Sequence, residues 1–374
     1  MALVLNQEQD MLRESALQFM KESAPVARLR ALRDERNDDG FSRDLWAGFA
    51  EMGFTGVLVP EAHGGLGLGM TEAGAIMEAI GRNLTATPFF STAVLGASLL
   101  ARHGSAAQQA RWLPALARGE LLVALAVDEA AKHRPERIGL RAGRDGDGYL
   151  LDGEKLFVVD GHVADLLLVA ARMDEGGVTL FAVEGRAAGL RRERTGMVDA
   201  HNAARLAFDG VCVGPEAVIG EAGQGGALLE AVLDIGRAAL AAELLGIADE
   251  VFERTQAYLK ERRQFGQIIG EFQALQHRSS MLYCDIELTR AIVLGAQQAL
   301  DEGSPQGAAL VSAAKSRAGL TATMAVQEGV QMHGGIGMTD EFEIGFFMKR
   351  ARVAEELLGD ARFHADRWAR LQGY

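Results

Sequence analysis

The sequence predicts a mainly helical α+β protein built from three successive units. Three observations lead to this class: apolar residues at helical spacing in the first third, short strand-like runs broken by glycine turns in the middle, and long helical patterns after them. The 374 residues, 48% of them apolar, are enough for two or three packed cores. We expect an N-terminal α-helical domain over 1–120, a β-barrel domain over 121–222 and a C-terminal four-helix bundle over 223–374.

The N-terminal domain is predicted to hold several helices. Residues 6–23 begin with Asn6, which can cap a helix, and Gln9 three residues later completes a capping box. Further helical patterns cover residues 42–52, 71–82, 91–103 and 107–117. The glycine-rich segment 53–69 does not match G-x-G-x-x-G, so a Rossmann phosphate loop is not expected there.

The middle of the chain has the texture of an antiparallel β-barrel or sandwich. Short apolar or alternating runs cover residues 121–127, 148–159, 165–172, 178–183 and 204–213. Asp-Gly and Gly-Gly pairs separate several of these runs, and such pairs are typical of tight turns between strands. Helical patterns return over 225–262, 272–302, 305–332 and 339–370, and four long helices indicate a bundle.

Composition limits the classes of function. A net charge of -13 argues against binding to nucleic acid or to anionic membranes, although a local group of arginines can still hold an anionic cofactor. Cys212 and Cys284 fit no metal-ligand spacing, and without a signal-peptide pattern they suggest a reducing, cytoplasmic setting. No run of about 18 apolar residues indicates a membrane span. The histidines are scattered; His162, in a predicted strand turn, is expected to be structural.

The segment Ile235–Gln273 carries the clearest chemical signal. It reads as a long helix that ends in Arg262, Arg263 and Phe265. Guanidinium forks match phosphate oxygens, and aromatic faces stack on planar rings, so this combination suits an anionic, planar ligand. ERRQFG (261–266) followed by EFQ (271–273) resembles the R-x-Q-F-G…FQ signature of the acyl-CoA dehydrogenase family.

The resemblance extends over nearly the whole chain. Its other pieces are LVPEAHGGLGLG (58–69), DGEKLFVVDGHVADLLLVAAR (152–172) and QMHGGIGMTDEFEI (331–344), in the order that the family has them. The family carries FAD between its β unit and its four-helix unit, and the adjoining subunit reaches the ADP half. The resemblance implies cofactor-binding roles for Arg262, Phe265, Gln273, Gln331, His333, Gly334, Gly335, Phe157 and Val159, where Val159 replaces a usual threonine.

The family removes a proton next to a thioester carbonyl and passes a hydride from the next carbon to the flavin. That chemistry needs a carboxylate base, which the family usually carries as the glutamate of a Y-E-G-T motif. Here this position falls on Leu358, and the alternative position at the start of the long helix falls on Gly236. The catalytic base is therefore not identified. Asp360 is a weak candidate, for which a helix cap or salt bridge is the expected role, and Glu243 is a weaker one.

Two further positions bear on the substrate side. Arg237, directly after Gly236, is expected to face the substrate. The T-E-P…G-S-D segment, which in the family helps to hold flavin and substrate, is replaced by Asp128-Glu129-Ala130 and AKHRPER. Chain-length specificity is not readable, but small residues in the helices that would floor the pocket suggest room for a bulky acyl group: Gly96, Ala97, Gly236 and Ala239.

Three accounts of the missing glutamate stay open. A nearby carboxylate substitutes for it, or the chain is the base-lacking subunit of a heteromeric enzyme whose homologous partner supplies it, or the chain binds without turnover. The second account is favoured. A flavin oxidase on the same fold is a further alternative. The expected partners are an acyl-CoA substrate, an electron-transfer flavoprotein, and either further copies of the chain, as a dimer or tetramer, or a homologous subunit in a heterotetramer.

Overall fold

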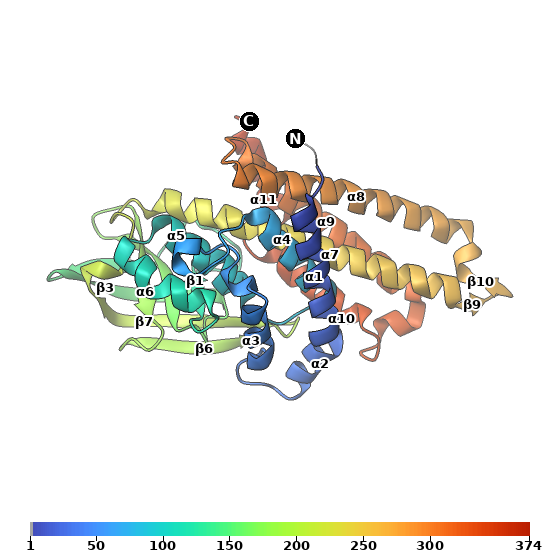
Figure 1. Ribbon diagram of the computed structural model, residues 1–374, viewed down its shortest axis with the longest axis horizontal. Coiled ribbons are helices and arrows are strands. Elements are labelled where there is room, and N and C mark those ends of the chain that lie inside the picture. The colour runs from blue at the N-terminus through green and yellow to red at the C-terminus, as the bar shows by residue number, and fades with distance from the viewer. Residues whose placement is uncertain (1–2) are drawn as a thin grey trace. The chain divides into compact units, whose positions relative to one another are not determined.

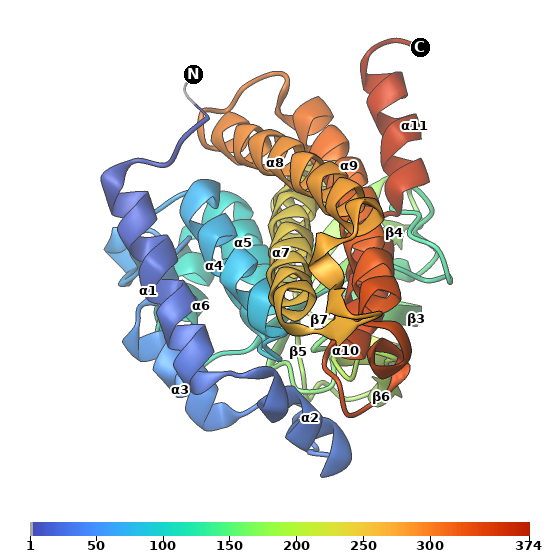
Figure 2. The ribbon, with the colours of Figure 1, turned by 90° about the vertical axis from the view of Figure 1, so that its right-hand side faces the viewer.

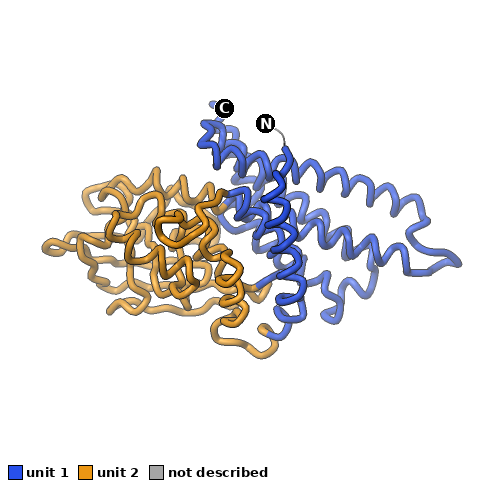
Figure 3. The backbone as a smooth tube through the Cα atoms, in the orientation of Figure 1, with its two compact units in different colours: residues 1–31, 70–85, 237–374 blue, residues 32–69, 86–236 orange. Residues whose placement is uncertain are grey.

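The computed structural model describes residues 3–374, and Figure 1 shows its helices and strands along the chain. The chain divides into two compact units (Figure 3). Unit 1 combines residues 1–31, 70–85 and 237–374, and unit 2 combines residues 32–69 and 86–236. The predicted N-terminal domain thus contributes segments to both units, and the predicted boundaries at residues 120 and 222 stay predictions.

Unit 2 is organised around one sheet. Its strands are β1 (Val123–Ala126), β2 (Arg141–Asp145), β3 (Gly148–Val159), β4 (Leu166–Met173), β5 (Val178–Glu184), β6 (Leu190–Gly196), β7 (Asn202–Val213) and β8 (Val218–Ile219). They lie in the order β6-β7-β3-β2-β4-β5-β8, with β1 paired to β4. Tight turns containing glycines at positive φ join β2 to β3 and β4 to β5, as the Asp-Gly and Gly-Gly pairs predict.

The sheet is mixed, which corrects the expectation of a purely antiparallel one. Most strand pairs are antiparallel, but β4 pairs in parallel with β1 over residues 166–169 and with β2 over residues 172–173. The two strands therefore succeed each other along one edge of β4. Parallel partners need a long connection, and about 40 residues separate β1 from β4, whereas the turn signals report only on neighbouring strands.

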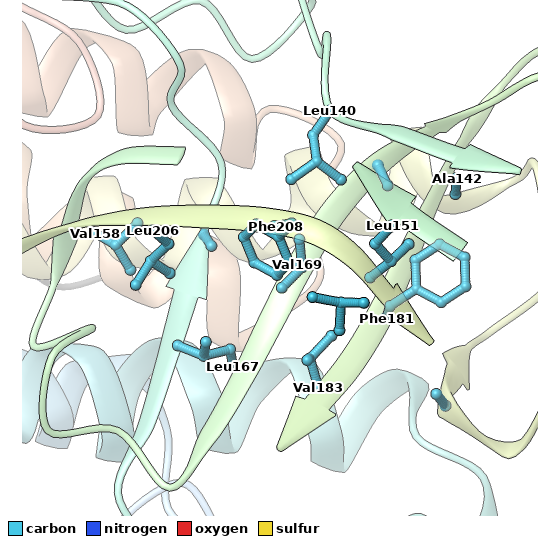
Figure 4. Close-up of a cluster of buried hydrophobic side chains, with 14 of the residues drawn as sticks. Leu140, Ala142, Leu151, Val158, Leu167, Val169, Phe181, Val183, Leu206 and Phe208 are labelled. Carbon is cyan, nitrogen blue, oxygen red and sulfur yellow. The ribbon is translucent and has the colours of Figure 1, made fainter. Parts of the chain in front are cut away.

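The core of the sheet is built from side chains that alternate along its strands. Figure 4 shows Leu151, Phe181, Leu206 and Phe208 among the buried residues that pack together. The rings of Phe181 and Tyr149 meet edge-on at 5.1 Å between centroids. Period-two alternation of this kind places one face of each strand in the core, which is why the strand runs were visible in the sequence.

Short helices complete unit 2. They are α3 (Arg43–Glu51), a π-helix (Phe89–Gly96), α5 (Ala97–His103) and α6 (Ala106–Ala117). Ser42 caps α3, and Ser105 with Gln108 forms a capping box at α6. The nine-residue helix α2 (Val26–Asp34), which passes from unit 1 into unit 2, was missed because its polar composition resembles a connecting segment.

Unit 1 is helical. Its helices are α1 (Gln7–Ser23), α4 (Met70–Asn83), α7 (Gly225–Glu261, in unit 1 from Arg237 onwards), α8 (Gln273–Asp301), α9 (Gly307–His333), α10 (Ile344–Glu356) and α11 (Ala361–Leu371). Helices α8 and α9 run side by side (Figure 2). Helices α4 and α7 cross at backbone contact: a Cβ added at Gly81 would lie 2.1 Å from the Glu243 carbonyl oxygen. Any larger residue at position 81 would push the helices apart.

The fourth long helix that the sequence predicts over 339–370 is two helices. Helix α10 ends at Glu356 and α11 begins at Ala361. Between them Leu358 and Gly359 have φ values of +56° and +109°, which no helix accommodates. Asp360 then caps α11 by accepting a hydrogen bond from the Phe363 N–H (2.8 Å). Gly359 followed by a capping Asp is the signal that predicts this break.

Candidate functional site

A short hairpin at the end of α7 presents the predicted cofactor aromatic. Strands β9 (Arg263–Gln264) and β10 (Gln267–Ile268) pair around the two-residue tip Phe265–Gly266. Both tip residues have positive φ, +53° and +84°, as two-residue hairpin turns with this twist require. A phenylalanine in this conformation is uncommon and is held by the pairing on either side of it.

The side chains of this hairpin face solvent. Phe265 is 90% exposed, and its ring meets Phe272 edge-on at 6.2 Å between centroids. Arg262 and Arg263 are exposed, and neither makes a salt bridge to a carboxylate among residues 3–374. Gln273, at the start of α8, is also exposed. Two uncompensated guanidinium groups beside an exposed ring fit a dinucleotide, whose pyrophosphate is anionic and whose rings are planar.

A second group of predicted cofactor residues lies where α9 ends. Gln331, Gly334 and Gly335 are exposed, and Gly334 ends the helix with φ +66° and ψ -141°. A Cβ added at Gly334 or Gly335 would meet nothing within 4 Å. The backbone here is therefore bare on its outer side, which permits the close approach of a ligand expected at this segment.

His333 is placed differently from the sequence prediction. Its ring is buried, 3% exposed, and its Nδ1–H donates to the Gly329 carbonyl oxygen (2.7 Å). The ring lies between Tyr258 and Phe342, at 4.4 Å and 4.7 Å between centroids. Burial lowers the pKa of His333, so the neutral ring packs beneath the glycine segment instead of facing outwards.

The remaining cofactor candidates lie on β3 in unit 2. Register shifts between Lys155 and Val158 mark a bulge, and Phe157 within it has φ +52°. The bulge turns Phe157 outwards, leaving it 38% exposed, whereas Val158 is buried in the sheet core. Val159 is partly buried at the strand end. Bulges commonly re-aim a side chain beside a functional site.

The segment that replaces T-E-P…G-S-D is held by buried charges. The His133 Nδ1–H donates to the Asp128 carboxylate (2.8 Å), and the His133 side chain is 2% exposed. Glu129 accepts hydrogen bonds from Lys155 Nζ (2.6 Å) and from the backbone N–H groups of residues 139 and 140. Burial lowers the pKa of Lys155, while the Glu129 carboxylate opposes that shift. The segment is thus fixed to β3 by an ion pair.

The turn at Leu358, where the family glutamate is expected, is held by hydrogen bonds from three basic residues, one on each of three helices. Its Leu358 carbonyl oxygen accepts from His364 Nε2 (3.1 Å) and from Arg237 Nε (3.4 Å). Lys315 Nζ donates to the carbonyl oxygens of Glu355 (2.9 Å) and Gly359 (3.1 Å). These bonds satisfy carbonyls that the broken helix leaves without helical partners.

Burial keeps two of these side chains from carrying full charge. It lowers the pKa of Lys315 to about 7 and that of His364 to about 2, and the neighbouring cations reinforce both shifts. A neutral Lys315 amine still has two N–H groups for its two carbonyl acceptors. Leu358 itself is 9% exposed and apolar, and its correspondence to the family glutamate stays a prediction.

Replacing Lys315 by methionine is expected to remove a pH dependence of stability. The folded-state pKa of about 7 lies below the ordinary lysine value of 10.5, so between these values the unfolded chain binds more protons and stability rises with pH. Denaturant midpoints of the natural chain and Lys315→Met, measured from about pH 7 to about pH 10, should show this slope only in the natural chain. Equal slopes would show that the buried amine is not the cause.

The carboxylates near this turn are engaged elsewhere. Asp360 caps α11, the structural role expected for it. Glu243 is 1% exposed and receives two bonds from Arg350, to Oε1 (2.5 Å) and Oε2 (2.9 Å). Glu355 Oε1 accepts the Ala361 N–H (3.1 Å). Hydrogen bonds to a carboxylate make it a weaker proton acceptor, and each of these three accepts at least one, so none of them is a good candidate for the base.

The residues predicted on the substrate side are all buried. Arg237 is 0% exposed, its guanidinium lies 5.6 Å from the centre of the Phe363 ring, and it supports the Leu358 turn. A Cβ added at Gly96 would lie 2.8 Å from Val123, so the absence of a side chain there is explained by packing against β1. Ala97 and Ala239 are 0% exposed. Room for a bulky acyl group stays a prediction.

Comparison with known proteins places the chain in a family. The family model for the acyl-CoA dehydrogenase N-terminal domain matches residues 6–120, and that for the acyl-CoA dehydrogenase C-terminal domain matches residues 223–371. The mitochondrial isovaleryl-CoA dehydrogenase of Pongo abelii is 31% identical, with 94% of this chain and 85% of the relative covered. The chain belongs to the acyl-CoA dehydrogenase family. As a member it is a flavoprotein oxidoreductase that acts on CH–CH groups and carries FAD.

Two solved acyl-CoA dehydrogenase folds that resemble the chain come from assemblies of two named components. The Tcur3481-Tcur3483 steroid ACAD has a TM-score of 0.89 and 33% identity, with 98% of both chains covered. The ChsE4-ChsE5 complex from Mycobacterium tuberculosis has a TM-score of 0.91 and 25% identity, with 100% of this chain and 99% of the other covered. They confirm the predicted fold class and show that heteromeric assemblies occur among structural neighbours. Among residues 3–374, none of the helices is both long and apolar enough to cross a membrane.

Proposed function

We propose that this acyl-CoA dehydrogenase oxidises the α,β bond of an acyl-CoA thioester as one subunit of a heteromeric enzyme, with the base supplied by a homologous partner. The observation that carries the proposal is the Leu358 turn. The residue at the position predicted for the family glutamate has a strained backbone with positive φ, but it is a leucine. The carboxylates of Asp360 and Glu243 are engaged in other hydrogen bonds. The names of the Tcur3481-Tcur3483 and ChsE4-ChsE5 structures support a two-component assembly.

Backbone strain supports the choice of cofactor and base positions. Seven non-glycine residues among the described ones have positive φ, and three of them are Phe157, Phe265 and Leu358. Each such residue costs of order 1–3 kcal/mol, and strain of this kind concentrates at functional sites. Two of the three are the predicted flavin aromatics, and the third is the predicted base position. The coincidence of positive φ with these three predicted positions supports their assignment to the site.

The residues have separate tasks in this proposal. Bound FAD would supply hydride acceptance. In unit 1, Arg262 and Phe265 would hold its pyrophosphate and adjoining ring, and Gln331, Gly334 and Gly335 would contact its adenosine end. In unit 2, Phe157, turned outwards by its bulge, would cover the flavin ring. The α proton leaves to a carboxylate that this chain does not provide.

The decisive experiment compares the chain alone with the chain co-expressed beside a homologue that carries the glutamate. Anaerobic addition of acyl-CoA should bleach the flavin absorbance of the co-expressed assembly. The chain alone should bleach slowly or not at all. Bleaching by the isolated chain at the rate of the assembly would overturn the partner account, and oxygen consumption without an added acceptor would indicate a flavin oxidase.

Replacing Arg262 by glutamine is expected to weaken FAD binding about tenfold or more, because a charge-assisted bond to the pyrophosphate is lost. The measurement is flavin content after purification and the FAD concentration needed to restore it. Arg370→Gln is the matched control, since Arg370 is an exposed arginine of unit 1 that pairs with Asp366. Equal FAD affinity in both variants would remove Arg262 from the cofactor site.

The proposal extends to the cellular compartment and to the electron acceptor. Cys212 and Cys284 are both free and exposed, which suits a reducing, cytoplasmic compartment. An electron-transfer flavoprotein is the expected acceptor, because a dehydrogenase must pass its electrons on before the next turnover. Reoxidation of the bleached assembly by such a protein, with little reoxidation by air, is the matching assay.

A further inference from the structure

A hollow in unit 2 has no part in the proposed reaction. It has a volume of about 410 Å³ and lies where the start of α3, helix α6 and the ends of β4, β5 and β6 meet. Four arginines line it: Arg43, Arg111, Arg186 and Arg192. In a chain with a net charge of -13, four guanidinium groups around one hollow are a local concentration of positive charge.

The carboxylates of the hollow already have donors within the protein. Asp39 receives two bonds from Arg43, at 2.7 Å and 3.0 Å. Glu184 receives one from Arg111 (2.8 Å). Asp165, the third lining carboxylate, accepts the N–H of residue 122 (3.0 Å). Asp39 and Glu184 are each paired with an arginine, and Asp165 adds a third negative charge, so the four arginines exceed the lining carboxylates by one positive charge.

The other two arginines have no carboxylate partner among the described residues. Arg186 is exposed at the end of β5 and makes no salt bridge. Arg192 donates one bond, from Nη1 to the Ala164 carbonyl oxygen (2.8 Å). Its position is restricted, because a Cβ added at Gly185 would lie 3.2 Å from Nη1 and 2.2 Å from that carbonyl. The guanidinium group of Arg192 is thus positioned by one hydrogen bond, and most of its N–H groups remain available to a ligand.

His162 adds a second polar group to the same hollow. Both ring nitrogens are shielded from solvent, and neither makes a hydrogen bond to the described residues, although the carbonyls of Asp38 and Asp39 lie near the ring. Burial and the nearby Arg194 lower the pKa of His162, so the neutral ring has one N–H to donate. The Asp38 and Asp39 carbonyls lie close enough to raise that pKa, so a ligand oxygen would compete with them for the one N–H.

We infer that this hollow binds a phosphoryl group, with Arg186 and Arg192 as its charged donors and His162 as a neutral one. Arginine forks bind phosphate oxygens through paired N–H bonds, and the neutral imidazole adds a donor without repelling either guanidinium. The hollow is large enough for a pyrophosphate. None of its residues is among those assigned above to FAD or to the base, so the inference can fail while those assignments stand.

The test is calorimetric titration of the full-length protein with inorganic phosphate, pyrophosphate and CoA at constant ionic strength. The double variant Arg186→Gln/Arg192→Gln should bind pyrophosphate about tenfold more weakly or worse. Arg205→Gln is the control, because Arg205 is an exposed arginine of the same unit that pairs with Glu154. Thermal melting of both variants shows whether unit 2 remains folded, and the single variant Arg186→Gln, at an exposed position, repeats the test if it does not.

The arms of the titration identify the source of the phosphoryl group. If the double variant binds pyrophosphate more weakly but binds CoA with unchanged affinity, the hollow takes a free anion. If its affinity for CoA falls as well, the hollow takes a phosphate of the thioester substrate. If none of the three probes binds saturably, or if the control weakens binding as much as the double variant, the inference is wrong.

Discussion

A chain carrying Leu358→Glu is expected to bleach its flavin with acyl-CoA about 10²- to 10⁴-fold faster than the natural chain when each is tested without a partner, as a positioned general base contributes. The turn around residue 358 is already built, with its carbonyls held by Arg237, Lys315 and His364. Only the carboxylate is missing. Leu358 is 9% exposed, so a glutamate at this position would be largely shielded from bulk water.

The matched control is Leu358→Gln, which has the size and polarity of the glutamate but cannot take a proton. Anaerobic stopped-flow bleaching should separate the two variants, and the rate of the glutamate variant should rise with pH through the pKa of its carboxyl group. Equal rates in both variants would mean that residue 358 does not face the α carbon. That result would reject residue 358 as the base position but would leave the assignment of the FAD-binding residues unchanged.

Arg350→Met is expected to lower the free energy of unfolding of the helical unit by about 3–5 kcal/mol. Arg350 is the partner of Glu243, whose side chain is 1% exposed, so removing the guanidinium leaves a carboxylate buried without compensation. The pair joins α7 to α10. Denaturant unfolding followed by circular dichroism measures the effect, since this unit is helical.

The same helix offers the control. Arg352 in α10 pairs with Glu355 and Glu356, but its side chain is 69% exposed, so Arg352→Met should cost less than about 1 kcal/mol. The double variant Arg350→Met/Glu243→Leu should regain most of the lost stability, because two apolar side chains replace the buried pair. Failure of the double variant to recover would show that packing, and not the unpaired charge, causes the loss.

Much of the fold could be predicted because its signals are local. The capping box at Asn6, the long apolar pattern of α7 and the glycine turns between β2 and β3 each arise within a few residues. The mixed sheet could not be predicted in this way. Pairing of β1 with β4 joins residues that are about 40 positions apart, and the local sequence of a strand does not specify which distant strand it pairs with.

The candidate site was predictable as residue types and not as side-chain environments. Arg262, Phe265 and the glycines after α9 are exposed, as a ligand site requires. His333 and Arg237 are buried, and one rests between aromatic rings while the other supports a turn. A sequence motif lists these residues side by side, but whether a polar side chain faces outwards depends on which helices cover it.

Residue types and their spacing were enough to predict the family and the order of helical and strand regions, and they place Leu358 where the resemblance expects a glutamate. These features depend on residue type and spacing along the chain and not on tertiary contacts. The engagement of Glu243 could be seen only in the tertiary structure, because its bonds from Arg350 join two separate helices, whereas the cap that Asp360 forms is local to α11. Hydrogen bonds across helices, formed when the chain packs, fix which acidic groups remain free to accept a proton.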